Sequence, residues 1–187
     1  MLLAYRVFPY IPGTTNCVPG SPTYLHKPQG RGRLDNPDHY DIWYLALEAS
    51  GAIGESFGDL PEWNDNMFAF PGLLGSRRAL GTYQLSDDVP VLELDDAKAL
   101  LERGLRPTQV IERNRPATQR WARAVFDERS DQGARLWAGV RWWSYHRPSW
   151  RILGVWGATP KCVDVADLAT THPAVQDAAA LLSKATV

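Results

Sequence analysis

The chain has 187 residues, a net charge of −1, a hydrophobic fraction of 44% and a charged fraction of 22%. These values predict one globular domain over residues 1–187, and the lack of a basic excess argues against direct nucleic-acid binding. No run reaches the about 18 apolar residues that a membrane helix needs, and Arg6 interrupts the apolar start that a signal peptide requires. We therefore expect a cytoplasmic protein that does not contact membranes, with Cys17 and Cys162 as reduced thiols.

The first predicted elements are two strands separated by a long irregular segment. The stretch LAYRVFPY predicts a strand over residues 3–10, and DIWYLA predicts a buried strand over residues 41–46. Residues 11–38 are rich in proline and glycine. An irregular segment of that length inside a domain is usually functional, so we expect it to contribute to a binding site.

The helix expected over residues 47–59 contains an unusual number of glycines. These are Gly51, Gly54 and Gly58. Each glycine inside a helix costs about 0.8–1 kcal/mol relative to alanine, so the glycines require an explanation. Ile53 and Phe57 share a stripe that would face the core, whereas Glu55 points roughly to the opposite side. A carboxylate flanked by bare backbone suits a ligand pressed against the helix; the alternative is an exposed acid on a helix that needs glycine for close packing.

The second half of the chain mixes strands and helices without a βαβ alternation. After an irregular stretch, strands are expected over residues 81–86, 89–94, 133–147 and 149–157, and helices over residues 95–104, 115–129 and 171–185. The helix over residues 115–129 has the clearest amphipathic pattern, with Trp121, Ala124 and Val125 on one stripe. Together these elements predict an α+β fold with a mixed, mostly antiparallel sheet.

Common catalytic and metal-binding signatures are absent. The sequence contains no GxxxxGK[ST], HExxH or GxSxG motif, and its four histidines are scattered. The two arginines in QGRGRLDNP, Arg31 and Arg33, are flanked by glycines that let a backbone approach a ligand, and arginine binds phosphate bidentately. The alternative is a pair of solvated loop arginines.

A cluster of aromatic residues surrounds Ser144 in GVRWWSYHR. Trp142, Trp143 and Tyr145 could wall an aromatic pocket, or fill the core on alternating faces of a strand. Most of the eight tryptophans are expected to belong to the core.

Five stretches of the chain, taken in order, resemble the RES domain family. They are YRVFP, GRGRLDNP, IWYLALEASGAIGE, RPATQRWARAVFDERSDQGARLWAG and VRWWSYHRPSWRILGVWG. The resemblance extends from about Tyr5 to Gly157. Members of this family are typically toxins of bacterial toxin–antitoxin pairs, and the family takes its name from an Arg, a Glu and a Ser. The resemblance implies a fold similar to that of ADP-ribosyltransferases and an enzyme that cleaves NAD.

The resemblance also implies which residues form the site. The residues that match the family's positions are Arg33, Tyr44, Glu55 and Ser144. Arg31 and Glu48 are poorer matches for the Arg and the Glu. We therefore predict four catalytic residues, Arg33, Tyr44, Glu55 and Ser144, and substrate binding by Arg31, Arg33, Tyr44 and Ser144.

Physical chemistry is consistent with these roles. The nicotinamide–ribose bond of NAD breaks through an oxocarbenium-like state, and nicotinamide leaves as a neutral molecule, so a general acid is unnecessary. Glu55 would stabilise the developing positive charge or hold the ribose hydroxyls. Arg33 would hold the pyrophosphate or an incoming phosphate, Tyr44 would stack on nicotinamide or ribose, and Ser144 would hydrogen-bond ribose or phosphate. NAD is then the substrate, and no metal is expected.

Three functions remain open at this level. The first is a toxin that depletes NAD by phosphorolysis or hydrolysis; the second is an ADP-ribosyltransferase that modifies a protein; the third is a non-catalytic interaction protein with the RES fold. The resemblance implies a helix-turn-helix antitoxin as partner, whose C-terminal segment blocks the active site. It is compatible with a homodimer inside the toxin–antitoxin complex, and it assigns DNA binding to the antitoxin.

Overall fold

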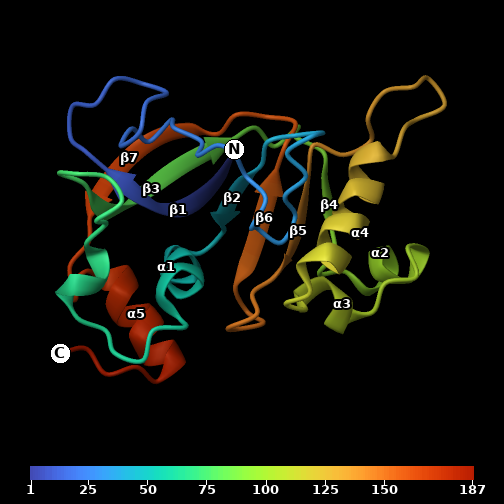
Figure 1. The fold of residues 1–187 in the computed structure, drawn as a ribbon. Coiled ribbons are helices and arrows are strands. Elements are labelled where there is room, and N and C mark those ends of the chain that lie inside the picture. The colour runs from blue at the N-terminus through green and yellow to red at the C-terminus, as the bar shows by residue number, and fades with distance from the viewer.

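The computed structural model describes residues 1–187, and its central element is a seven-stranded sheet with the order β4-β5-β6-β2-β1-β3-β7 (Figure 1). The strands are β1 (Leu2–Tyr10), β2 (Trp43–Ala46), β3 (Arg77–Leu85), β4 (Val91–Glu93), β5 (Gly139–Trp143), β6 (Arg151–Val155) and β7 (Lys161–Asp167). All neighbouring strands are antiparallel except β4 and β5, which are parallel. The predicted α+β class with a mixed, mostly antiparallel sheet is confirmed.

The helices lie on one side of the sheet (Figure 1). They are α1 (Ala49–Phe57), α2 (Ala97–Glu102), α3 (Pro107–Ile111), α4 (Arg115–Asp127) and α5 (Pro173–Leu182), with a 3₁₀ turn η1 (Asp65–Phe68). In Figure 1, α1 and α5 pack together below β1 and β3, whereas α2 and α3 lie below the end formed by β4 and β5, and α4 is drawn at the height of β4. None of these helices is long and apolar enough to span a membrane.

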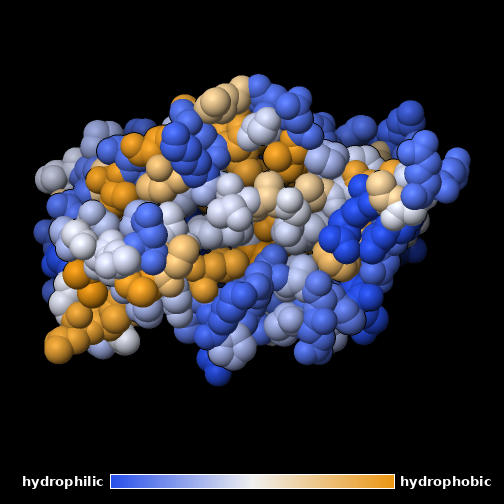
Figure 2. Space-filling view, turned by 90° about the horizontal axis from the view of Figure 1, so that it is seen from above, coloured by the Kyte–Doolittle hydropathy of each residue, from blue (hydrophilic) through white to orange (hydrophobic).

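Each face of the sheet has its own hydrophobic cluster. A cluster of 27 buried residues, which includes Ile53 and Phe57, fills the space between the sheet and the helices. A smaller cluster of 7 buried residues, which includes Trp43, lies on the opposite face. Seen from above in Figure 2, apolar residues reach the surface over the left and central parts, and the right-hand end is hydrophilic. Because side chains alternate along β2, Tyr44 points to the helical side.

The segment between β1 and β2 passes from one face of the sheet to the other. Leu25 packs against the smaller cluster, and the carbonyl of Pro22 accepts a hydrogen bond from the Tyr83 hydroxyl at 2.8 Å. Leu34 and Tyr40, later in the same segment, belong to the large cluster on the helical side. The irregular segment expected from the sequence therefore delivers residues 30–36 to the face that carries α1 and α4.

Several predicted boundaries were wrong. The strand predicted over residues 133–147 is limited to β5, and β3 begins four residues before the predicted start at residue 81. The predicted stripe of α4 is wrong at Ala124, which is exposed; Ala122 and Phe126 are buried instead. The sequence reading missed β7 and α3. Strand β7 is an edge strand with mostly exposed side chains, so it lacks the apolar alternation on which strand prediction depends.

Candidate active site

A pocket of about 380 Å³ opens on the helical side of the sheet. Its lining includes Arg33 from the loop before β2, Tyr44 from β2, Glu55 from α1, Arg115 from the start of α4 and Trp142 from β5. The volume is in the range of small-molecule sites. Elements that are far apart in the sequence thus place one carboxylate, several guanidinium groups and several aromatic rings around the same cavity.

Glu55 lines one side of this pocket and is held by Ser144. Glu55 lies on the solvent side of α1, opposite the buried Ile53, as the helical spacing predicts. Ser144 is only 1% exposed, and its hydroxyl donates a hydrogen bond to a Glu55 carboxylate oxygen. The same hydroxyl oxygen accepts a hydrogen bond from the His146 backbone at 3.0 Å. Ser144 does not line the pocket, so it orients Glu55 from behind instead of facing a ligand.

The loop between β5 and β6 packs against the glycines in α1 and at its C-terminal end. A Cβ atom at Gly54 would lie 2.2 Å from Cζ3 of Trp150, and one at Gly51 would lie 3.3 Å from the Cβ of Trp150. A Cβ atom at Gly58 would lie 2.8 Å from the ring of His146. The idea that bare backbone serves a ligand is therefore wrong for these glycines. They allow Trp150 to lie on the helix, which brings Ser144 to Glu55.

Arg33 is held by α3 and α4, on the other side of the pocket from Glu55. Its Nη1 atom donates hydrogen bonds to the carbonyls of Val110 at 3.0 Å and Glu112 at 2.5 Å, at the end of α3. Its backbone carbonyl accepts a hydrogen bond from the Thr118 hydroxyl of α4 at 2.6 Å. Burial lowers the pKa of Arg33, the positive charge of Arg115 lowers it further, and Glu55 acts in the opposite direction. Arg33 thus lies in a half-buried, positively charged part of the site.

Asp35 holds the loop that carries Arg33 against Tyr44. One Asp35 oxygen accepts hydrogen bonds from the backbone N–H groups of Gly30 and Gly32, each at 2.7 Å. The other oxygen accepts a hydrogen bond from the Tyr44 hydroxyl at 2.6 Å. A Cβ atom at Gly32 would lie 2.3 Å from Asp35 and 2.6 Å from the Tyr44 hydroxyl. Gly32, which also lines the pocket, is therefore required by this internal contact.

The comparison with known families identifies the chain. A family model described as RES domain matches residues 5–177. The chain belongs to the RES domain family. No curated protein matches it. The match includes every residue predicted for the site, and RES domains are associated with toxin-like, NAD-related functions and NAD-acting enzymes.

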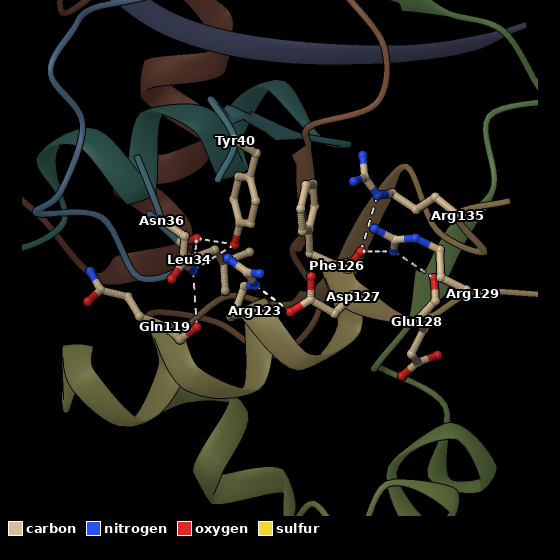
Figure 3. Close-up of polar contacts among 10 residues, drawn as sticks. All are labelled: Leu34, Asn36, Tyr40, Gln119, Arg123, Phe126, Asp127, Glu128, Arg129 and Arg135. Atoms are coloured by element: carbon tan, nitrogen blue, oxygen red, sulfur yellow. Dashed lines mark hydrogen bonds and ion pairs between the residues drawn. The ribbon is translucent and has the colours of Figure 1, made fainter. Parts of the chain in front are cut away.

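In this RES domain, hydrogen bonds to the backbone carbonyls of Leu34 and of Gln119 in α4 also hold the loop that carries Arg33. Figure 3 shows Asn36 and Tyr40 directed at the carbonyl of Leu34, with Gln119 of α4 beside them. The Tyr40 hydroxyl donates a hydrogen bond to this carbonyl at 2.6 Å, and Asn36 donates to the Gln119 carbonyl at 3.1 Å. Burial raises the pKa of Tyr40 to about 12, so its hydroxyl remains a donor at neutral pH.

Two arginines cap the C-terminal end of α4. The carbonyl of Phe126 accepts hydrogen bonds from Arg129 at 2.8 Å and Arg135 at 3.2 Å (Figure 3). The Arg135 guanidinium also lies 3.6 Å from the centroid of the Phe126 ring. Cations at a helix C-terminus are favourable, so these contacts stabilise the helix that supports the Arg33 loop.

The other predicted site residues lie outside the pocket. Arg31 is exposed and does not line it. Glu48 accepts a hydrogen bond from the Arg151 backbone at 2.8 Å and pairs with its guanidinium at 3.2 Å, so it joins α1 to β6. Tyr145 is 50% exposed, and of the three aromatic residues near Ser144 only Trp142 lines the pocket. No three His, Cys, Asp or Glu side chains are grouped so that they could hold a metal ion.

The sequence reading missed Asp35, Thr118, Gln119 and Arg115. The first three act by holding backbone or side-chain atoms of other site residues, which no local motif reveals. Arg115 lies in RPATQRW, next to the proline that marks the start of α4, and was read only as part of a helix.

We expect Tyr44→Phe to lower the free energy of unfolding by about 1–2 kcal/mol. The change removes the hydroxyl that donates to Asp35 and accepts the Leu34 N–H at 2.8 Å, so two polar groups lose a partner. Urea unfolding measures the effect, with Tyr145→Phe as a matched control because its hydroxyl is exposed and unbonded. Equal stability of the two variants would contradict the role of the Tyr44 hydroxyl.

Proposed function

We propose that this RES domain cleaves NAD at the nicotinamide–ribose bond. One observation carries the proposal: Glu55 and Arg33 line the same pocket from opposite sides, each held by contacts to other elements. A carboxylate and a guanidinium in one cavity match the two charges of the substrate near the reacting centre, which are the developing oxocarbenium ion and the pyrophosphate.

In the proposed reaction, the bond between C1′ of the ribose and the nicotinamide nitrogen breaks. The electron pair leaves with nicotinamide, which becomes neutral. The Glu55 carboxylate stabilises the positive charge that develops on the ribose, and Ser144 keeps that carboxylate in place. Water or inorganic phosphate then forms the new bond to C1′, and its proton passes to solvent.

Tyr44 and Arg33 position the substrate in this scheme. Burial raises the pKa of Tyr44 well above its ordinary value, and the charge of Asp35 adds to the shift. The Tyr44 hydroxyl is engaged with Asp35 and the Leu34 N–H, so its ring, and not its hydroxyl, is the part available to a substrate. Arg33 keeps donors beyond those bound to α3, and these suit a pyrophosphate oxygen.

Incubation of the purified protein with NAD labelled in the adenosine part tests the proposal. We expect release of nicotinamide and a free ADP-ribose product, with phosphate added or withheld to identify the acceptor. Label retained on a protein would favour the second candidate, an ADP-ribosyltransferase that uses the same pocket. Absence of nicotinamide release under all conditions would favour a non-catalytic RES protein.

We further propose that the chain acts as a cytoplasmic toxin with a helix-turn-helix antitoxin as partner. This rests on the membership of the RES family and on the resemblance of the sequence to its toxins. Expression of the chain alone should arrest growth, and co-expression of a small helix-turn-helix protein encoded beside it should restore growth. Unimpaired growth at high expression of the folded chain would contradict this part of the proposal.

A further inference from the structure

Arg115 has an unmatched guanidinium in the pocket. Its Nη1 atom is buried and has no hydrogen-bond partner, and the side chain takes part in no ion pair. Buried polar atoms in proteins are almost always hydrogen-bonded to protein or to water. Because this side chain lines the pocket, its guanidinium is available to a ligand that supplies the partner.

Other arginines with a buried unpaired nitrogen are explained by their surroundings. Arg103 pairs with Glu128 at 2.9 Å, and Arg123 pairs with Asp127. Arg78 lies over aromatic rings, at 5.3 Å from that of Phe70. Among these residues only Arg115 lines the pocket.

The surroundings of Arg115 are positively charged. Arg33 lines the same pocket and pairs with carbonyls instead of carboxylates. Burial and the charge of Arg115 both lower the pKa of Arg33. Arg6 also borders the pocket, but its guanidinium lies over the ring of Trp43, 4.9 Å from the centroid. The anion-attracting part of the pocket is thus formed by Arg33 and Arg115, with Glu55 as the one carboxylate of the lining.

We infer that Arg115 and Arg33 together form an oxyanion subsite that binds a phosphate group. The inference rests on the proposed function for the identity of the substrate, because the phosphate group is either the pyrophosphate of NAD or free inorganic phosphate. Two guanidinium groups suit either source, since each presents several donors that pair bidentately with phosphate oxygens. Arg115 is then a substrate-binding residue that faces Glu55 across the pocket.

Binding measurements on Arg115→Gln test this subsite without requiring turnover. Calorimetry with ADP and with adenosine separates phosphate contacts from nucleoside contacts. Thermal unfolding in phosphate or chloride at equal ionic strength tests free phosphate. Arg120→Gln is the matched control, because Arg120 is an exposed arginine on the same helix that does not line the pocket.

We expect Arg115→Gln to weaken ADP binding by about tenfold or more and to leave adenosine binding and the Arg120→Gln control unchanged. If Arg115→Gln weakens only the binding of ADP, the subsite is assigned to the pyrophosphate. If the variant loses the thermal stabilisation that phosphate gives the wild type, the subsite is assigned to free phosphate. The inference is wrong if Arg115→Gln binds both anions as the wild type does, or if the wild type binds neither. A wild type that binds ADP through Arg115 but never releases nicotinamide would contradict the proposed function and leave the subsite intact.

Discussion

Replacing Glu55 by glutamine is expected to slow NAD cleavage by about a hundredfold or more. Glutamine keeps the size of the side chain, and its amide oxygen can still accept the hydrogen bond from Ser144. The variant therefore removes the negative charge while the local packing remains. Single-turnover measurement of nicotinamide release, at saturating NAD, isolates the effect on the chemical step.

Glu48→Gln is the control for this experiment. Glu48 is also a carboxylate at α1, and it was the competing match for the family Glu, but it binds Arg151 outside the pocket. The control should retain a wild-type rate. A Glu55→Gln rate within about twofold of the wild-type rate would contradict the proposed role of the carboxylate.

The second large effect concerns stability. Gly54→Ala is expected to lower the free energy of unfolding by about 3 kcal/mol. At an unobstructed helical site the same change raises stability by about 1 kcal/mol, because alanine has the higher helix propensity. The effect on stability changes sign here because the new methyl group would lie 2.2 Å from the Trp150 ring, which is 2% exposed and packed in the large hydrophobic cluster. Urea unfolding of the purified variants measures the difference.

A double-mutant cycle identifies Trp150 as the cause. Phenylalanine at position 150 lacks the outer ring atoms, Cζ3 and Cη2, that the alanine methyl would meet. In a Trp150→Phe background, Gly54→Ala should therefore cost at least about 1 kcal/mol less than in the wild type. An identical cost in both backgrounds would show that the clash with Trp150 does not determine the effect.

The sequence predicted the fold class because most of its elements carry local signals. Largely apolar runs marked β1 and β2, and the amphipathic pattern marked α4, which Asn114 caps through the Ala117 N–H. Strand β7 carried no such signal, since its mostly exposed side chains need no apolar face. Its place in the sheet depends on pairing with β3, a contact between distant parts of the chain.

For the site, residue types and family order predicted which residues would meet, but not what each of them contacts. Tyr44 and Glu55 line one pocket, and of the two arginines considered Arg33 lines it whereas Arg31 does not. The sequence left the α1 glycines open between a ligand and close packing, because Trp150, the partner of Gly51 and Gly54, lies about a hundred residues further along the chain. Arg115 was missed because an unpaired buried nitrogen exists only in three dimensions.

The packing of Trp150 on α1 has an evolutionary consequence. Residues 54 and 150 share one volume, so a side chain can be added at Gly54 only if the ring at Trp150 becomes smaller. Relatives that carry alanine or serine at the first position should therefore carry a smaller residue at the second. Such paired substitutions would preserve the distance between Glu55 and Ser144. Co-variation of positions 54 and 150 would then identify the residues that hold the site in place, independently of the residues that face the substrate.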